Sequence, residues 1–411
     1  RLLVCELRAC YPVTSLKVLL QSGSLQVTAG TAEVLLTYNG PLVRNNNSNS
    51  FLNGTINFKN GKILYAPRNV WMTDINGALS FKNSDLLIEN IQCKVFDNKI
   101  TMNGTASNAL TLISTAPNEV IVNYNIYTPS LNLAPFAILL QARKKTSSAS
   151  KNQFGNLASQ IDELLDKSVV NVDLKADQFL YHKVNGSNLN AGISILQDRY
   201  LLNNVTMNMA EGSMAMKGSL VSIANGRHRA ALSARLQNVN VKKIFYEFDN
   251  FGQDAITYVN LEGKLTAAAN VNIEIGQDEK VIPSSSEGII DFSLKKGALN
   301  NFTPIKKIQN FVFKKRDFEN IQFAELKNKL TINHGEININ RMEIQSSVLT
   351  LYVEGLYSQK GNTDMSVQIP LSNLKSRDSA YIPKNKGTGK SGGSSIFLRG
   401  RPGKDGDIEF K

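Results

Sequence analysis

Apolar and polar side chains alternate along most of the chain, and three long segments repeat the same pattern. Residues 79–104, 193–218 and 330–355 align with one another without gaps. Each segment opens with an apolar, a hydroxyl-bearing and an apolar residue, passes through a polar turn and closes on a glycine. Internal self-similarity of this kind indicates a protein built from repeated structural units.

The pattern has a period of two within each segment, which places successive side chains on opposite faces of a β-sheet. Each segment is therefore predicted to form antiparallel strands with tight turns at 83–85, 197–199 and 334–336. Thr101, Asn103, Asn338 and Asn340 fall on the outer, polar face. The closing glycine indicates a turn, or a place where two backbones approach too closely for a side chain.

The opposite face of each segment is predicted to be apolar and to line a groove that could accept an apolar ligand. Its candidate residues come from equivalent positions of the three segments. They are Leu79, Phe81, Ile88, Ile100, Met102, Ile193, Ile195, Leu202, Met214, Met216, Leu330, Ile332, Ile339, Leu351 and Val353.

These features predict a mainly β fold, namely an elongated, curled antiparallel sheet built from repeats, with a few amphipathic helices. The length of 411 residues suits two to three domains. We divide the chain into a first β-repeat unit (1–143), a linker with an amphipathic helix (144–168), a second β-repeat unit (169–287) and a C-terminal β unit (288–411).

Local signals add further elements. Asn60-Gly61 lies between two strand-like runs, 55–58 and 62–65, and predicts a type I′ hairpin turn. Alternation predicts strands at 169–176 and 288–294. Apolar spacing and an N-cap signal predict helices at 154–165, at 241–251 and directly after Thr303-Pro304. Segments rich in Ser, Asn, Lys or Gly predict linkers at 45–50, 144–152, 276–287 and 384–395.

The chain has a formal net charge of +12, but its basic residues are spread along its length. We interpret most of them as the solvated faces of strands and helices. The densest group, FVFKKR at 311–316, fits the face of an amphipathic helix, and contact with an anionic membrane surface is the main alternative. Nucleic acid is not a predicted partner.

Cysteine usage leaves the redox compartment open. Cys5, Cys10 and Cys93 form neither a disulfide framework nor a CxxC zinc motif. Cys5 and Cys10 are close enough in sequence to pair, but the sequence does not decide whether they do.

Catalytic and cofactor motifs are weak. The stretch 387–392 matches GxGxxG and overlaps a GxSxG, but it lacks the preceding strand and following helix that these motifs need. His182, His228 and His334 are far apart, and each lies near a predicted turn or strand end, which predicts solvated side chains. We therefore predict a non-enzymatic protein with no catalytic residue, no metal ligand and no cofactor.

The assembled residues resemble the AsmA family, cell-envelope proteins of Gram-negative bacteria that are related to TamB. The clearest similarity covers 288–383. It comprises DFSLKKGAL at 291–299, FTP at 302–304, IQFAEL at 321–326, MEIQSS at 342–347, VEG at 353–355 and PLSNL at 370–374. A fainter similarity covers 54–133, with DING at 74–77 and residues 86–91 ahead of Asn103-Gly104.

This resemblance implies a location and a role. AsmA-like proteins are anchored in the inner membrane by one N-terminal helix and project into the periplasm as curled sheets with an apolar groove. The family's association with outer-membrane biogenesis, protein targeting and phospholipid transport implies an envelope lipid as ligand and envelope proteins as further partners. The chain begins at Arg1 and shows no run of about 18 apolar residues, so we expect the anchor to have been removed.

Three functions compete at this stage. The leading hypothesis is an envelope protein that binds or conveys lipid in an apolar β-groove. The second is a structural or interaction scaffold that assists protein targeting to, or assembly in, the outer membrane. The third is an enzyme on a β-helix, such as a polysaccharide lyase, which would need clustered carboxylates or basic residues where the repeats place Asn, Ser and Thr.

Overall fold

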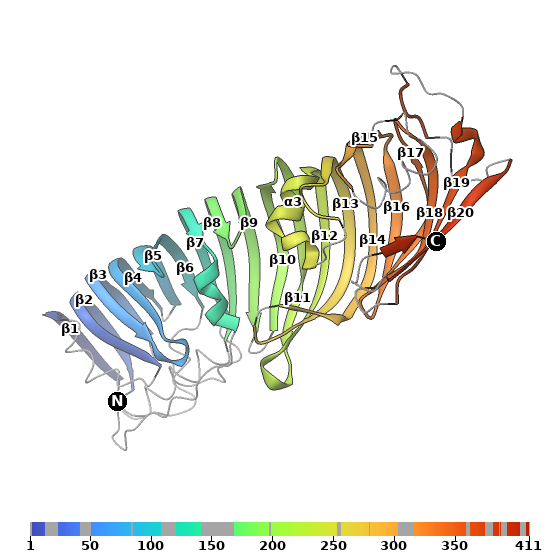
Figure 1. Cartoon of the computed structure of the whole chain (residues 1–411). Coiled ribbons are helices and arrows are strands. Elements are labelled where there is room, and N and C mark those ends of the chain that lie inside the picture. The colour runs from blue at the N-terminus through green and yellow to red at the C-terminus, as the bar shows by residue number, and fades with distance from the viewer. Residues whose placement is uncertain are drawn as a thin grey trace. The chain divides into compact units, whose positions relative to one another are not determined.

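A computed structural model of the chain describes residues 2–12, 24–41, 51–83, 85–107, 121–140, 168–196, 199–252, 256–278, 280–302, 316, 318–358, 362–374, 381–385, 387, 393–402 and 408–410. Strands hold 76% of these residues, so the predicted mainly β fold is confirmed (Figure 1). The chain splits into two compact units. Unit 1 comprises Arg1–Tyr181, Ser187–Val205 and Ser219–Gly226, and unit 2 comprises His182–Gly186, Thr206–Gly218 and Arg227–Lys411.

Unit 1 consists of long strands with short 3-10 turns between some of them. Its elements are β1 (Leu2–Pro12), β2 (Leu25–Pro41), β3 (Phe51–Tyr65), η2 (Ala66–Arg68), β4 (Val70–Lys82), β5 (Asp85–Val95), β6 (Asn98–Ala106), β7 (Ile121–Asn132), η5 (Ala134–Leu140), β8 (Val169–Tyr181) and η6 (Ala224–Gly226). The strands β9 (Val184–Leu196), β10 (Arg199–Met209) and β11 (Gly212–Ser222) contribute residues to both units.

Unit 2 contains the one α-helix among the described residues. Its elements are β12 (His228–Asn240), α3 (Val241–Glu247), η7 (Asp249–Gly252), β13 (Leu261–Ile275), β14 (Val281–Asn300), β15 (Asn320–Phe323), β16 (Leu326–Asn333), β17 (Glu336–Gln345), β18 (Thr350–Ser358), β19 (Asp364–Pro370), η8 (Leu371–Leu374), β20 (Ser395–Pro402) and β21 (Ile408–Phe410).

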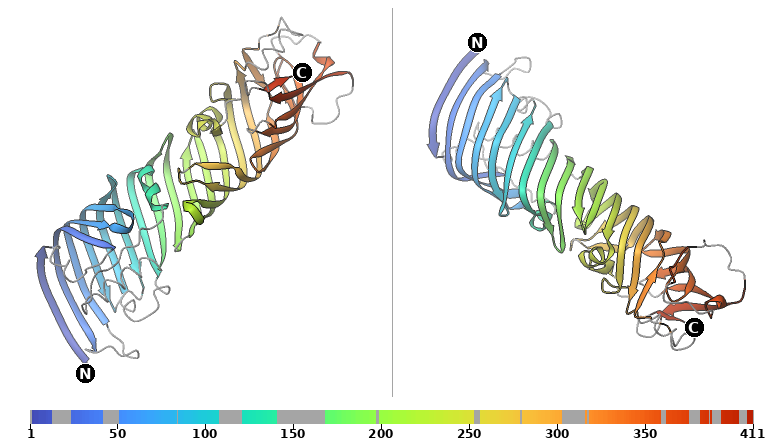
Figure 2. Two further views of the ribbon diagram at one scale, coloured as in Figure 1. Left: turned by 60° about the horizontal axis from the view of Figure 1, so that its bottom comes forward. Right: turned by 90° about the horizontal axis from the view of Figure 1, so that it is seen from above.

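In unit 1, strands that follow one another along the chain pair antiparallel from β1 to β7. In unit 2, antiparallel pairing runs from β12 to β21. There β14 pairs with both β15 and β16. Figure 2 shows the strands of unit 1, in blue to green, side by side in one curved layer. The pair β7–β8 departs from this order because it is parallel. A parallel pair needs a crossover connection, and residues 133–168 supply it.

The internal repeat is structural as well as sequential. Its three copies fall on β4–β6, β9–β11 and β16–β18. In the first copy Ile88 lies opposite Gly104 and Ile91 opposite Met102. The equivalent residues of the third copy pair in the same way, and a bulge interrupts both ladders at the same place, between 88 and 91 and between 339 and 342. The first and third copies of the repeat therefore share the same strand register as well as the same sequence pattern.

The closing glycines lie where the next strand leaves no room for a side chain. A Cβ on Gly104, Gly218 or Gly355 would come closer than 3.0 Å to a backbone carbonyl oxygen of the neighbouring strand. Those oxygens belong to Asn123, Ala231 and Asp364 respectively. The predicted close backbone approach is confirmed.

The hairpin predicted at Asn60-Gly61 is wrong. Strand β3 runs through both residues, and it pairs with β2 and β4 on either side of them. Asn60 has a φ of 52° and is the extra residue of a bulge between Phe58 and Gly61. The left-handed conformation that makes Asn-Gly a turn signal also suits a bulge, which bends a strand without ending it.

The remaining predictions differ in outcome. The helix expected at 241–251 ends at Glu247 and gives way to η7. The linker expected at 276–287 is too long, because β14 already begins at Val281. The strands expected at 169–176 and 288–294 are confirmed within β8 and β14. The helices expected at 154–165 and after Thr303-Pro304, the linkers 45–50 and 144–152, the basic stretch 311–315 and most of 384–395 lie outside the described residues.

Candidate functional site

All fifteen residues predicted to line an apolar face lie on strands, and none of them is exposed. Ile88, Ile100 and Leu351 are buried, and the other twelve are half-buried. Half-burial means that these apolar side chains still reach solvent on one side. The face is therefore neither a fully enclosed core nor an ordinary polar surface.

In unit 1 the apolar face is built from rows that cross the strands. One row runs from neighbour to neighbour through Val34, Ile56, Leu79, Ile88, Gly104, Tyr124 and Val172, from β2 to β8. Directly opposite side chains on paired strands contact one another, so this row is interrupted only at Gly104, which has no side chain. Part of it is packed into a core cluster that contains Ile75, Ile88 and Ile91.

Unit 2 has equivalent rows. One runs through Ala234, Ala269, Ile290, Leu330, Ile339, Gly355 and Met365, from β12 to β19. A second runs through Leu232, Val271, Gly288, Ile332, Ile337 and Tyr357. The members on β12 and β13 were missed by sequence reasoning, because these strands lie outside the repeats. The alternation of Leu265, Ala267, Ala269 and Val271 is the signal that could have found them.

Each unit covers part of its apolar face with a short helical segment. In unit 1, Phe136, Ile138 and Leu139 of η5 pack on the core cluster. The η5 backbone is fixed there because Arg68 donates to the Ile138 oxygen at 3.1 Å and the Tyr200 hydroxyl donates to the Leu139 oxygen at 2.8 Å.

In unit 2 the cover is α3, which lies across the strands in Figure 1. Val241 of α3 packs with Leu294 and Leu326 of the sheet, and Phe245 joins the edge of this cluster. The helix begins at the N-cap Asn240, whose side chain accepts a hydrogen bond from the Lys243 backbone N–H.

The outer face carries uncharged polar side chains in hydrogen-bonded rows. In unit 1 the Asn171 amide donates to Asn123 Oδ1 at 3.0 Å, the Ser194 hydroxyl donates to Asn171 Oδ1 at 2.8 Å, and the Asn203 amide donates to Ser194 Oγ at 3.0 Å. This ladder joins β7, β8, β9 and β10. Its members carry neither a carboxylate nor a base.

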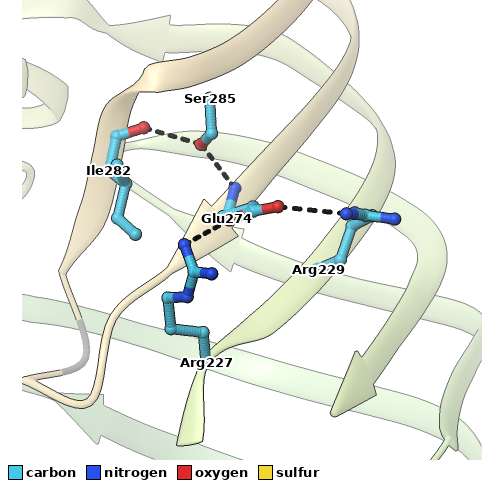
Figure 3. Close-up of polar contacts among 5 residues, drawn as sticks. All are labelled: Arg227, Arg229, Glu274, Ile282 and Ser285. Carbon is cyan, nitrogen blue, oxygen red and sulfur yellow. Dashed lines mark hydrogen bonds and ion pairs between the residues drawn. The ribbon is translucent and has the colours of Figure 1, made fainter. Parts of the chain in front are cut away.

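A charged cluster in unit 2 has the geometry of a stabilising contact and not that of a catalytic site (Figure 3). Glu274 accepts hydrogen bonds from Arg227 and Arg229, each at 3.1 Å. Ser285 accepts from the Glu274 backbone N–H at 2.7 Å and donates to the Ile282 oxygen at 2.7 Å. Because the Ser285 proton goes to a backbone carbonyl rather than to a base, the cluster fixes the irregular start of β14 and does not activate a nucleophile.

The histidines do not meet in the described part of the chain. His182 and His334 are exposed in turns, as predicted, and His334 Nδ1 lies 3.6 Å from Glu287 Oε1. The prediction is wrong for His228, which is buried because it begins β12 on the same face as Ala230 and Leu232. Among the described residues no group of three or more His, Cys, Asp or Glu could hold a metal ion.

Cys10 and Cys93 are free, and they differ in environment. Cys10 is exposed and Cys93 is buried. Burial raises the pKa of the Cys93 thiol to about 11, so at neutral pH it is protonated and behaves as a small apolar side chain.

Comparison with known protein families, curated proteins and solved structures finds no match for this chain. Within the described residues no helix is long and apolar enough to cross a membrane. The apolar rows extend from β2 to β8 in unit 1 and from β12 to β19 in unit 2. Their half-buried side chains leave apolar surface on which a ligand can lie.

Proposed function

We propose that the chain is an AsmA-like, non-enzymatic protein of the Gram-negative envelope that binds or conveys lipid on the apolar face of its sheet. The observation that carries this proposal is the extent of the apolar rows, whose members are mostly half-buried, such as the row from Ala234 to Met365 in unit 2. Anchoring in the inner membrane and a periplasmic location are part of the proposal and rest on the sequence resemblance.

The energetics of an acyl chain support this choice of ligand. Each methylene that leaves water contributes about 0.8 kcal/mol, so ten methylenes contribute about 8 kcal/mol before the costs of association are subtracted. A lipid tail needs no specific polar partner along its length. A sheet face of aliphatic side chains can therefore hold it without a recognisable site motif.

A scaffold that binds envelope proteins is the second candidate. It is favoured by large apolar side chains exposed away from the rows, such as Phe397 on β20, which is 67% exposed, and Ile382, which is 73% exposed. Exposed apolar patches of this kind are common at protein–protein contacts. A partner that stays bound when the apolar rows are mutated would favour this candidate.

A matched pair of charge substitutions on β17 tests the lipid proposal. Ile339 is half-buried in the apolar row, and the next residue, Asn338, is exposed on the outer face. We expect Ile339→Asp to weaken binding of a fluorescent phosphatidylglycerol at least ~10-fold, since a carboxylate on this face must be desolvated beside the tail. Asn338→Asp places the same charge one residue away and should bind like the wild type.

Ile339 is preferred to its repeat equivalent Ile88, which is buried in the core cluster. A charge at Ile88 would unfold unit 1 and make any loss of binding ambiguous. Equal binding by the wild type and the Ile339→Asp variant, with both folded by circular dichroism, would reject the apolar face as the binding site.

A further inference from the structure

Helix α3 covers part of the apolar face of unit 2 and presents aromatic rings on its other side. Ile244 is buried, and Phe245 packs against the buried cluster that contains Leu294 and Leu326 of the sheet. The exposed fractions of Tyr246, Phe248 and Phe251 are 48%, 42% and 56%. A ligand that follows the apolar face would therefore meet aromatic surface where α3 interrupts the aliphatic rows.

Three of these rings form a path from the sheet to solvent. The rings of Phe245 and Phe251 lie edge to face with their centroids 5.2 Å apart. Phe251 and Phe248 are stacked with centroids 5.6 Å apart and an interplanar angle of 2°. Since Phe245 belongs to the edge of the core cluster, the apolar surface continues without a break to the exposed ring of Phe248.

The backbone that carries Phe251 is strained. Asp249, Asn250 and Phe251 are consecutive and all left-handed, with φ values of 49°, 53° and 56°. L-residues other than Asn and Asp rarely adopt this conformation, and it costs conformational free energy. Two contacts hold the turn: the Tyr258 backbone N–H donates to Asn250 Oδ1, and the Phe251 N–H donates to the Phe248 oxygen, each at 2.8 Å.

This strain does not bury Phe251, whose ring stays more than half exposed. Residues held in such conformations persist where the surroundings impose them, and they cluster at ligand-binding elements. Contacts with Phe245 and Phe248 fix the position of the Phe251 ring, and its exposed side remains open to a ligand.

Near α3, Asp249 of η7 pairs with Lys183 and Glu211 pairs with two lysines, so the ammonium groups outnumber these carboxylates. Glu211 accepts hydrogen bonds from both Lys243, at 3.1 Å, and Lys264, at 2.8 Å, so one carboxylate faces two ammonium groups. Lys242 is exposed on the first turn of α3 and forms no ion pair with a described residue. The helix rises about 1.5 Å per residue, so Lys242 and Phe248 lie about 9 Å apart along its axis, a span that a phospholipid covers from phosphate to acyl chain.

We propose that α3 and η7 form an aromatic ledge that binds a glycerophospholipid, with its phosphate near Lys242 and one acyl chain against Phe248 and Phe251. This inference rests on the proposed lipid function and deepens it, because it assigns a ligand class and a place on unit 2. It also gives a role to the left-handed turn, which would hold the rings of Phe248 and Phe251 stacked so that an acyl chain can lie against them.

The test uses the full chain and phosphatidylglycerol that carries a photoactivatable diazirine at the end of one acyl chain. After irradiation, peptide mass spectrometry locates the cross-links. We expect them on the peptide that contains residues 244–252, and we expect the double variant Phe248→Ser/Phe251→Ser to reduce them at least ~5-fold. Phe397→Ser is the control, since it removes an even more exposed ring from β20 of the same unit and should leave the yield unchanged.

A second arm tests the phosphate. Lys242→Glu should weaken phosphatidylglycerol binding while leaving the binding of diacylglycerol, which lacks the phosphate, unchanged. Equal weakening of both lipids would overturn the placement of the phosphate. Circular dichroism confirms that each variant is folded, as expected for substitutions of exposed side chains.

The possible outcomes distinguish failure of the proposed ledge from failure of the proposed lipid-binding function. A wild-type chain that takes up no phosphatidylglycerol would overturn both. Uptake with cross-links confined to β16–β18, undiminished in the double variant, would overturn the ledge alone. A dimer in solution that the double variant dissociates would show that the rings bind a second copy of the chain, and it would also overturn the ledge.

Discussion

At the scale of single residues, the closing glycine of the third repeat shows how a missing side chain fixes strand pairing. Gly355 has a φ of 136°, and a Cβ there would collide with the Asp364 carbonyl. We predict that Gly355→Ala lowers stability by roughly 2 kcal/mol or more, because the backbone is strained and β19 must move. The midpoint of thermal unfolding measures this loss.

Gly192 provides the control for this substitution. The nearest atom to a Cβ at Gly192 is Asp173 Oδ1, at 3.5 Å, an ordinary van der Waals distance. Gly192→Ala should therefore leave the midpoint unchanged or raise it slightly. Equal losses for the two variants would mean that general strand flexibility, and not close approach, accounts for the glycines.

Glu247 provides a residue-scale prediction about pH. Its Oε2 atom is buried without a hydrogen-bond partner among the described residues, and burial raises the pKa of this carboxyl above its usual value. Because the raised pKa favours the neutral form in the folded state, stability falls as the pH rises through the unfolded value toward the folded one. A negative charge at the C-terminal end of α3 also opposes the helix dipole.

We therefore expect Glu247→Gln to stabilise the protein at pH 7, by an amount on the order of 1 kcal/mol. The gain should disappear at about pH 3, where the carboxyl is neutral in both states. Thermal unfolding at the two pH values measures it. A variant that is less stable than the wild type at pH 7 would show that the carboxylate has a stabilising partner.

At the scale of elements, bulges with left-handed residues recur along the strands. Asn60, Asp74, Asn90 and Asn238 each have a positive φ and lie at a register shift. The Asn90 backbone N–H donates to Asn103 Oδ1 at 2.8 Å, which fixes the bulge of the first repeat copy. Such bulges increase local twist and bend, and they give long strands their curvature.

Two substitutions at Asn90 test this reading of the bulge. Asn90→Gly keeps the backbone hydrogen bond and the left-handed conformation and should change stability little. Asn90→Val should cost about 1 kcal/mol or more, because a β-branched residue disfavours φ near 46°. If valine were tolerated as well as glycine, as judged by urea unfolding, the bulge would not determine the strand's path.

Elements were predicted from the sequence where local periodicity decides the structure. The repeats, their turn at 334–336 and the close approach at Gly355 follow from alternation and from glycine recurring at one position. Asn60-Gly61 was misread because a turn and a bulge share the same left-handed residue. The parallel pair β7–β8 was not predicted, since a partner chosen across residues 133–168 leaves no local signal.

The candidate site was predictable to a similar extent. The fifteen face residues could be placed on strands because they repeat, but their half-burial depends on what covers the sheet, which no pattern specifies. The burial of His228 and the exposed rings on α3 and η7 likewise depend on tertiary packing. The sequence therefore predicts which face is apolar, but not where that face is open.

At the scale of the whole molecule, each of the two units carries its own apolar rows and its own helical cover. An apolar face of this extent is costly to leave in water, and solvated apolar surface is a liability unless something binds it. The proposed lipid ligand would cover this face, and the same chemistry would then serve both units without a site-specific motif.

Native mass spectrometry of the purified chain, with extraction and identification of any lipid that accompanies it, tests the central claim most directly. The proposal predicts phospholipid bound in stoichiometric amount, which Ile339→Asp removes and Asn338→Asp does not. A chain that is purified without lipid, and that also fails to take up added phospholipid, would contradict the lipid-binding account and leave the protein-binding scaffold as the better explanation.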